Sequence, residues 1–517
     1  MLSMYIMRMD KFSNFRITCI RFNTCIRLES TSVKPKNFCD IPGPRSLPLV
    51  GTLWKYAPMI GEYEFTRLHW NGLRKYQKYG QIVREEIVPG VPIVWVFSPE
   101  DIGRVFKAEG RYPERRSHLA LAKCRQDKPE VFNTGGLLPT NGPEWWRLRS
   151  AFQREISKVQ CVRGYLPTTN TVISEFLEEL KSNESSNKTA GDVLPKLSRL
   201  FLELIGVVAF DIRLESFSES EKSPMSKSSK LIEAAHSINS SILSTDNGLQ
   251  MWKWFDTPLF RKLKKAHSYM EQIAVQLVLQ KMELMKECAN KCSPEHHPSL
   301  LEAYLSSPDI DYKDVIGMAV DMILAGIDTT SNSVSFALYH LAKNPHAQMK
   351  LHEESCKLLS RVDCLVTAEM LSEAQYTKAV IKESFRLNPI SVGIGRILAQ
   401  DAVLSGYNVP KGTVVVTQNQ VSCRLARYFE SPHDFLPERW LKGEEAHKPA
   451  SPYLVLPFGH GPRTCIARRL AEQNMQVLLL KVARRYKIGW EGGMLDAVSL
   501  LINKPDQPVL LTFQDRH

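Results

Sequence analysis

One cysteine of this 517-residue chain lies in a segment that suits a metal-bound thiolate. The segment runs Pro457-Phe-Gly-His-Gly-Pro-Arg-Thr-Cys465, and its two glycines permit a tight backbone beside a flat ligand. Apolar residues continue at helical spacing after the cysteine, which predicts that a long helix starts at the cysteine itself. The free N–H groups and positive dipole end of a helix favour a thiolate over a thiol. Taken alone, the cysteine could also be a buried free thiol at the start of a core helix.

A second segment, Ala325-Gly-Ile-Asp-Thr-Thr330, lies inside a mostly apolar helix that we expect over residues 314–343. Gly326 costs about 1 kcal/mol in a helix interior relative to alanine, so we expect a close approach there. Thr329 can donate to the carbonyl four residues before it, which bends a helix and opens a notch. Such a notch could hold oxygen and water, and Asp328 with Thr329 could deliver protons. Ordinary packing with back-bonded hydroxyls is the alternative.

The two segments together resemble the cytochrome P450 family. Phe458, Gly461, Arg463 and Cys465 match its haem-binding signature Phe-x-x-Gly-x-Arg-x-Cys-x-Gly, whereas Ala467 stands where the family usually has glycine. The resemblance implies a mainly α fold with small β-sheets (α+β), a triangular helical domain enclosing haem. It implies haem b ligated by the thiolate of Cys465, with molecular oxygen as co-substrate.

The same resemblance assigns roles to residues elsewhere in the chain. Ala325 and Gly326 would lie against the cofactor, while Asp328 and Thr329 would be the catalytic acid and alcohol. Residues that would bind the cofactor through its propionates or its edge are Trp145 and Arg149, which form a Trp-x-x-x-Arg motif, with Arg396 and Arg463. An arginine suits a carboxylate because its guanidinium group can donate two parallel hydrogen bonds.

A structural network is expected beside the thiolate segment. Glu383 and Arg386 are three residues apart on a helix that ends before Pro389, so their side chains face each other. Alone this would be an everyday surface pair. With Pro437-Glu-Arg439 it resembles the Glu-x-x-Arg and arginine triad of the family, a buried network that holds the core.

The N-terminal 38 residues differ in composition from the rest of the chain. They are rich in Arg, Ser and Thr, poor in acidic residues and interleaved with apolar ones, which is typical of a mitochondrial transit peptide. A disordered basic tail is the alternative. No internal repeat or long linker divides the remainder. We therefore expect a cleaved transit peptide over residues 1–38 and one monooxygenase domain over residues 39–517.

The formal net charge of +12 suits an acidic partner or an anionic membrane, and no motif for reading nucleic acid is present. In mitochondrial members of the family, the pattern of Lys378, Lys382, Arg468 and Arg469 resembles the docking surface for a ferredoxin. These side chains could also be merely solvated. No flavin or NADPH domain is fused, so the resemblance implies electrons from a ferredoxin, supplied in turn by ferredoxin reductase and NADPH.

Two further segments carry weaker signals. The aromatic and basic stretches 251–255 and 259–265 predict peripheral contact with a membrane, on the matrix side of the inner mitochondrial membrane, although a buried core segment could look similar. Cys288, Cys292, His296 and His297 loosely suggest zinc, but their spacing is short and no further ligands follow.

The resemblance extends from Ile41 to about Leu511 and is closest to the arthropod ecdysteroid 22-hydroxylases. It rests on the stretches 115–122, 137–146, 466–475 and 501–506, and Ala467 fits this group. The match implies hydroxylation of a sterol side chain at carbon 22, converting 2,22-dideoxyecdysone to 2-deoxyecdysone. Walls facing the substrate would come from residues 118–138, Ala325, 391–394 and 501–502, which are mostly apolar. Another sterol, lipid or xenobiotic substrate remains open, as does a non-catalytic haem-thiolate carrier.

Overall fold

The structure is a computed structural model that describes residues 34–181, 191–288, 298–443 and 451–516. Residues 36–517 form one compact unit. The predicted transit peptide lies almost wholly outside the described residues, as do Cys292, His296 and His297 of the loose zinc pattern. Within the described residues, no cluster of three or more His, Cys, Asp or Glu side chains is arranged to hold a metal ion. None of the described helices is both long and apolar enough to cross a membrane.

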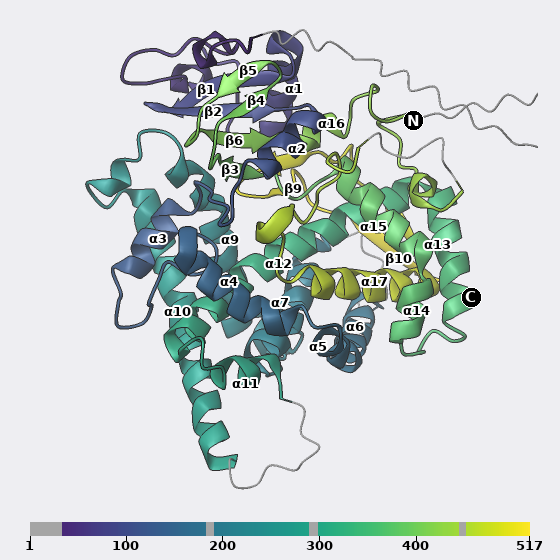
Figure 1. The fold of residues 1–517 in the computed structure, drawn as a ribbon. Helices are drawn as coiled ribbons and strands as arrows, with labels where there is room; N and C mark the ends of the chain where they lie inside the picture. Colours follow the sequence, from purple (N-terminus) through teal and green to yellow (C-terminus); the bar gives the residue numbers. More distant parts are fainter. Residues whose placement is uncertain (1–33, 182–190, 289–297, 444–450, 517) are drawn as a thin grey trace, which may run out of the picture. The chain divides into compact units, whose positions relative to one another are not determined.

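Helices dominate the unit (Figure 1). They are α1 Leu68–Tyr79, α2 Pro99–Lys107, α3 Leu119–Gln126, α4 Gly142–Ile156, α5 Val159–Gly164, α6 Leu166–Lys181, α7 Leu194–Phe210, α8 Glu219–Lys222, α9 Lys227–Asp246, α10 Pro258–Cys288, α11 Leu300–Leu305, α12 Tyr312–Lys343, α13 Pro345–Leu358, α14 Ala368–Glu373, α15 Gln375–Leu387, α16 Asn419–Ser422 and α17 Arg468–Arg485. The predicted mainly α fold with small sheets is confirmed.

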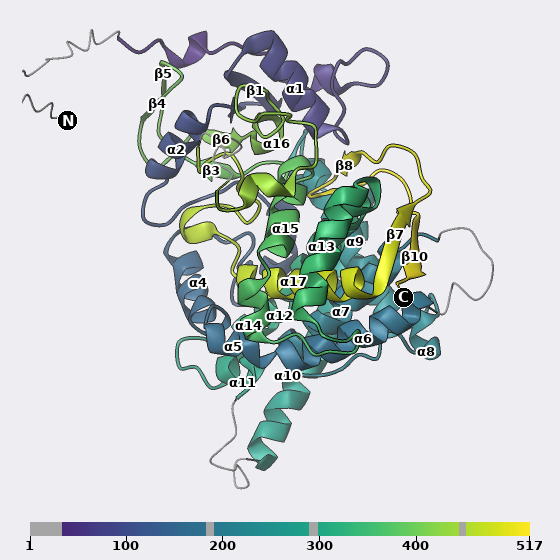
Figure 2. The same cartoon turned by 90° about the vertical axis from the view of Figure 1, so that its right-hand side faces the viewer.

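The strands form one four-stranded sheet and three two-stranded ones among the described residues. They are β1 Ile82–Val88, β2 Val91–Val96, β3 Gly395–Ile397, β4 Ala402–Leu404, β5 Tyr407–Val409, β6 Val414–Thr417, β7 Tyr486–Trp490, β8 Ala497–Ser499, β9 Asn503–Pro505 and β10 Leu511–Asp515. The larger sheet has the order β1-β2-β6-β3, in which β2 and β6 are parallel. Figure 2 shows this sheet with α1 and α2 at one end of the unit and most helices at the other.

Helix α12 begins and ends where the sequence provides the signals. Asp311 and Asp314 form a capping box at its start, each carboxylate accepting from the other's backbone N–H. Asn344 caps the other end, and Pro345 opens the next helix. Because the cap satisfies N–H groups that have no partner inside the helix, the start of α12 is fixed. The predicted helix over 314–343 is therefore confirmed.

Two hydrophobic cores meet along α12 and α17. The buried apolar residues of α12 between Val315 and Ile327, with Leu470 of α17, belong to one core, which also contains residues of α7, α9 and α10. Residues 334–341 of α12 and the remaining buried face of α17 belong to the other, which also contains α6 and α15. The segment 325–330 and the first turns of α17 therefore lie at the seam between the two cores.

Candidate functional site

The loop before α17 has the tight geometry that its glycines predict. Gly459 and Gly461 have φ values of 80° and 68°, in the left-handed region that favours glycine. A Cβ atom on Gly461 would lie 2.5 Å from Oε1 of Glu109. The Cys465 N–H donates to the carbonyl of Phe458 (2.8 Å), which closes the loop.

The predicted start of α17 at the cysteine is wrong: the helix begins at Arg468, after Ala467. The first helical hydrogen bond runs from the Ala471 N–H to the Ala467 carbonyl (3.0 Å), so residues 465–467 form the turn that leads into the helix. The backbone N–H of Ala467, in the turn that leads into the helix, is close enough to the Cys465 sulfur to lower the pKa of its thiol, against the larger opposite effect of burial. An N–H in this position favours the thiolate.

The sulfur-bearing side chain faces open space inside the protein. Cys465 is exposed, yet burial raises the pKa of its thiol. A side chain that is exposed and also surrounded by protein borders an internal hollow. Ile466 and Ala467 pack against the same core as the first half of α12. Arg149 is close enough to the thiol to lower its pKa.

Helix α12 is exposed at one place along its otherwise buried middle part. Ala325 is exposed and Gly326 and Thr329 are half-buried, although the helix around them is buried. The Thr329 hydroxyl donates to the Ala325 carbonyl, as predicted. Gly326 has a different neighbour, because a Cβ there would lie 2.5 Å from the Ile205 side chain of α7. Its close approach, predicted from the sequence, is to another helix.

Asp328 has partners that the sequence did not suggest. Its Oδ2 accepts from Nδ2 of Asn239 on α9 at 2.9 Å, and Nδ1 of His236 lies 3.9 Å from the same oxygen. Burial raises the pKa of the carboxyl, while Asn239, His236 and Lys504 oppose that shift. No spacing could have found these residues, since they come from α9 and β9.

Four arginines lie close enough to act on one another's charge, with Glu109 paired to one of them (Arg396): Arg115, Arg149, Arg396 and Arg463. Burial, and then repulsion by the other arginines, lowers the pKa of Arg463 to about 8. Burial also lowers the pKa of Arg149 to about 10 and that of Arg115 to about 10. The guanidinium group of Arg463 lies 4.1 Å from the ring centroid of Trp145, which is buried.

The hydrogen bonds of these arginines differ. Arg463 donates to the carbonyls of Pro113 and Thr140, but its Nη1 is buried without a partner among the described residues. Within the described part of the chain, Arg149 donates a side-chain hydrogen bond only from its Nε, to Oε1 of Gln153 (2.7 Å). The Nε of Arg396 is paired with Glu109 and its terminal nitrogens donate to backbone carbonyls, and its role toward the cofactor stays a prediction.

These observations fit a haem. A flat group with two carboxylates would fill the hollow between Cys465 and the opening in α12. It would also give the buried Nη1 of Arg463 an acceptor and compensate the repulsion among the arginines, since buried charges need partners. Arg115 belongs to this group and was missed by sequence reasoning, because nothing in its spacing distinguishes it from the adjacent Arg116.

The predicted structural network is present and fully buried. Arg386 and Arg439 both pair with Glu383 Oε1, at 2.7 and 3.0 Å, and the three side chains are 0% exposed. Trp440 donates to the other carboxylate oxygen (2.9 Å). Arg386 also donates to the carbonyls of Cys423, Pro432 and Asp434. Every polar atom of Glu383 and Arg386 is thus used to hold the segments before the thiolate loop.

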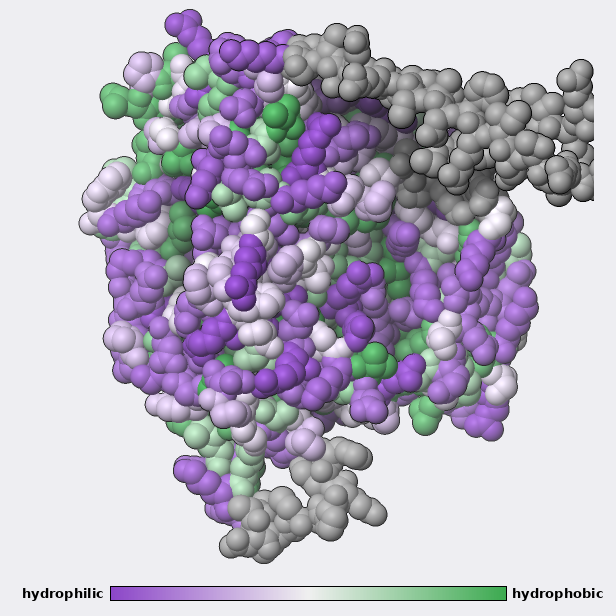
Figure 3. All heavy atoms as spheres, in the orientation of Figure 1, coloured by the Kyte–Doolittle hydropathy of each residue, from purple (hydrophilic) through white to green (hydrophobic). Residues whose placement is uncertain are grey.

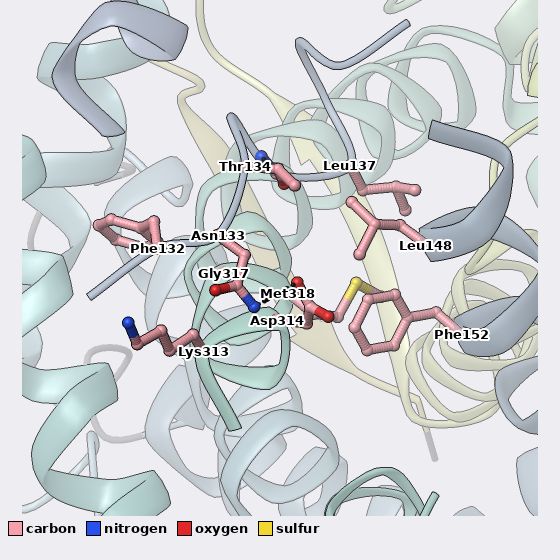
Figure 4. A pocket seen from close by; sticks show the side chains of 11 residues that line it. Phe132, Asn133, Thr134, Leu137, Leu148, Phe152, Lys313, Asp314, Gly317 and Met318 are labelled. Carbon is pink, nitrogen blue, oxygen red and sulfur yellow. Dashed lines mark hydrogen bonds between the residues drawn. The ribbon is translucent and has the colours of Figure 1, made fainter. Parts of the chain in front are cut away.

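A separate pocket lies between the loop that begins at Phe132, α4 and the first turns of α12 (Figure 4). Asp314 lines it and accepts from Asn133 (3.3 Å) and Arg147 (2.9 Å). None of the predicted cofactor-binding or catalytic residues lines this pocket. Its lining does include part of the predicted substrate wall, from Phe132 to Leu137.

The side chains proposed for partner docking lie partly together. Lys382 is exposed above the Trp440 ring (4.0 Å to the centroid), and Arg468 is close enough to lower its pKa. Lys378 is half-buried and donates to the Ser372 carbonyl. Arg469 points elsewhere, to the carbonyl of Ser157. On this side of the molecule, hydrophilic residues predominate over α3 and α4, with hydrophobic ones between them toward α15 and α17 (Figure 3).

The stretch proposed for membrane contact is divided between surface and core. Trp252 is buried and donates to the Thr245 carbonyl (2.7 Å), and Phe260 is also buried. Trp254 and Phe255 are exposed, at 73% and 55%. Some residues of this segment are therefore part of the core, and others are exposed at the surface as a membrane contact requires.

Comparison with known proteins agrees with this geometry. Residues 41–507 match the family model described as Cytochrome P450. The chain is 50% identical over 496 residues to "Cytochrome P450 302a1, mitochondrial" of Drosophila melanogaster, covering 95% of this chain and 98% of the relative. It is 31% identical to "Probable cytochrome P450 301a1, mitochondrial" (93% and 88% covered) and 29% identical to "Ecdysone 20-monooxygenase" (95% and 91%), both from the same organism. Membership implies a thiolate-ligated haem and molecular oxygen as co-substrate. With its cysteine loop, its opened central helix and its cluster of arginines, the chain belongs to the cytochrome P450 family of monooxygenases.

Proposed function

We propose that this monooxygenase hydroxylates carbon 22 of an ecdysteroid precursor, converting 2,22-dideoxyecdysone to 2-deoxyecdysone. The observation that carries the chemistry is the placement of Cys465 beside an internal hollow, with Thr329 at the opening in α12. The substrate is supported by the resemblance of four stretches to ecdysteroid 22-hydroxylases and by the similarity to a protein named for ecdysone. Residues 391 and 502, both in the proposed substrate wall, form a β-bridge.

The bound haem would activate molecular oxygen so that one atom enters a C–H bond and the other leaves as water. The reaction consumes two protons and two electrons for each hydroxyl formed. The protein holds the ligand thiolate with the N–H of Ala467 and the nearby Arg149 charge. Thr329 and Asp328 are consecutive residues of α12 whose side chains point in different directions, so a proton from the acid would reach the alcohol through water.

Replacing Thr329 by alanine should divert electrons from product to hydrogen peroxide. The variant keeps the thiolate and the arginines, so its spectrum with carbon monoxide should be unchanged. Because a positioned proton donor contributes about 10²–10⁴-fold, product formed per NADPH should fall by at least about tenfold. Thr329→Ser retains the hydroxyl and should form nearly as much product per NADPH as the wild type (this ratio is called the coupling). Equal coupling in the alanine variant and the wild type would remove Thr329 from the proton path.

Replacing Arg149 by alanine should weaken haem retention. A hydrogen bond to a charged group contributes about 1.5–3 kcal/mol, so the rate of haem transfer to an excess of apomyoglobin should rise by about ten- to a hundredfold. The matched control is Arg154→Ala on the same helix, where the side chain pairs with Asp309 at the surface. Equal transfer rates in both variants would assign Arg149 a role in packing only.

We propose that the electrons come from a ferredoxin, itself reduced by ferredoxin reductase and NADPH. Lys382 and Arg468 form the centre of the docking surface, and Lys378 and Arg469 flank it. Charge attraction of this kind speeds association and weakens with salt.

Lys382→Ala should therefore raise the ferredoxin concentration needed for half-maximal reduction by about three- to tenfold at low salt. The difference from wild type should shrink as salt is added. The carbon monoxide spectrum should not change. Lys357→Ala, on α13, is the matched control and should behave like the wild type. If Lys382→Ala needed the same ferredoxin concentration as the wild type for half-maximal reduction, Lys382 would not belong to the docking surface.

We propose a mitochondrial location on the matrix side of the inner membrane. Residues 1–38 would be the cleaved transit peptide. The exposed Trp254 and Phe255, with the basic residues that follow them, would make the peripheral membrane contact. Two of the similar proteins are named mitochondrial, which supports this location.

The deciding experiment is a reconstituted turnover with ferredoxin, ferredoxin reductase and NADPH. The substrate is 2,22-dideoxyecdysone, and mass spectrometry with NMR locates the new hydroxyl. Formation of 2-deoxyecdysone supports both the chemistry and the substrate. A preparation with an intact carbon monoxide spectrum but no product would overturn the substrate and leave another sterol, lipid or xenobiotic. Absence of oxygen consumption with every substrate would favour a carrier, which the presence of both Asp328 and Thr329 disfavours.

A further inference from the structure

Three polar side chains meet at Asp328 on the side of α12 that faces α9. Asn239 donates to Oδ2 of Asp328 (2.9 Å) and also to the carbonyl of Leu324 (3.2 Å). These two bonds fix one carboxylate oxygen against the helix. Oδ1 has no hydrogen-bond partner among the described residues, so the carboxyl group retains an oxygen for proton exchange.

His236 connects this acid to the outside. Its Nδ1 lies 3.9 Å from Oδ2 of Asp328, and its Nε2 lies 3.4 Å from Nζ of Lys504. The side chain of His236 is 48% exposed, whereas that of Asp328 is 8% exposed. The two imidazole nitrogens thus face different neighbours, one toward the acid and one toward a lysine on β9. A gap of 3.9 Å is longer than a hydrogen bond, and a single water can bridge such a distance.

The charges around the imidazole come from three elements. Asp328 of α12 raises the pKa of His236, while Lys504 of β9 and Lys262 of α10 lower it, and burial lowers it most. The pKa of Lys504 is also lowered, by burial. The pKa of Asp328 is raised by burial. Each shift favours the uncharged form of its group, which narrows the differences in pKa between the three groups.

We propose that His236, together with Lys504, is the entry point through which protons from solvent reach Asp328. A proton passes from the Lys504 ammonium group or from water to Nε2 of His236, and the proton on Nδ1 passes through a bridging water to the Asp328 carboxylate. Lys504 then regains a proton from solvent, and the exposed imidazole recovers its starting tautomer by exchange with water. Asn239 is a positioning residue that holds the carboxyl group. The inference rests on the proposed role of Asp328 and adds the residues that supply it.

The first test does not depend on turnover. The pKa of His236 is measured by NMR on protein labelled at histidine Cε1, with its signal assigned by its loss in His236→Gln. Because the negative charge of Asp328 favours the imidazolium form, the pKa of His236 should be lower in Asp328→Asn than in the wild type. An unchanged pKa overturns the inference, whatever the substrate of the enzyme is.

The second test measures coupling. His236→Gln should form about tenfold less product per NADPH, with a matching rise in hydrogen peroxide and an unchanged carbon monoxide spectrum. In the wild type, coupling should fall as pH rises through the range below the ordinary histidine pKa of about 6.5, because burial lowers the pKa of His236 and the donors lose their protons there, and the variant should lack this dependence. Lys504→Met should weaken coupling to a smaller extent. His346→Gln, at an exposed position of α13, is the matched control.

Each outcome of the coupling test decides the proposal. Loss of the pH dependence in His236→Gln, but not in His346→Gln, supports proton entry at His236. A variant with lower thermal stability but an unchanged pH profile and unchanged coupling would give His236 a purely structural role. Wild-type protein that forms no 22-hydroxylated product, but in which Asp328→Asn shifts the pKa of His236, would reject the proposed substrate and retain the proton path.

Discussion

Protein in which Cys465 is replaced by alanine should lack the red-shifted spectrum with carbon monoxide and should form no product. The thiolate is the proposed iron ligand, and the methyl group of alanine can neither coordinate the metal nor carry charge. Electron donation from the thiolate promotes cleavage of the O–O bond, so activity should fall below detection rather than by a small factor. Difference spectroscopy of the reduced protein with carbon monoxide is the measurement.

Cys161→Ala provides the control for the loss of a thiol. That residue is half-buried between α5 and the neighbouring core, and burial raises the pKa of its thiol. The control variant should keep both spectrum and activity. A red-shifted spectrum retained in Cys465→Ala would show that another group ligates the iron, and the assignment of the loop would fall.

Replacing Glu383 by glutamine should prevent stable folding. The change keeps the shape of the side chain but removes the charge that balances Arg386 and Arg439, both of which are 0% exposed. Breaking a buried ion pair by removing one partner costs about 3–5 kcal/mol, out of a total stability of about 5–15 kcal/mol for a typical protein. The expected result is little soluble protein and a lower temperature for loss of the carbon monoxide spectrum.

A surface ion pair serves as the matched comparison. Arg361 and Asp363 are paired at 2.6 Å, but both side chains are mostly exposed. Asp363→Asn should therefore leave the soluble yield and the unfolding temperature unchanged, since exposed pairs contribute little. If Glu383→Gln were as soluble and as heat-stable as Asp363→Asn, the buried network would have no special role in holding the loop.

Local patterns predicted those parts of the protein that depend on neighbours in the chain. The capped ends of α12, the glycine turns before Cys465, and the back-bonded Thr329 all follow from residues within a few positions of one another. The pairing of Glu383 with Arg386 follows from helical spacing. The start of α17 was misplaced because residues 465–467 form a turn whose apolar residues continue the helical spacing, and periodicity alone does not show which carbonyl accepts the first helical bond.

Contacts between distant segments could not be predicted in this way. Arg115 joins the arginine cluster from a loop some 350 residues before Cys465. Glu109 takes the Nε of Arg396, a residue predicted to bind the cofactor. The partners of Asp328 come from α9 and β9. Each case depends on tertiary packing, which places side chains together without any mark in the local sequence.

The seam between the two hydrophobic cores has a consequence for motion. Helices α12 and α17 each contribute residues to both cores. The segment 325–330 and the first turns of α17 lie where each helix passes from one core to the other. A small displacement of one core against the other would widen the hollow without exposing the interior of either. Passage of a bulky sterol would then require only sub-global opening, with a free energy well below that of unfolding. Amides along 325–330 should accordingly exchange with deuterium sooner than those in the flanking turns of the same helix.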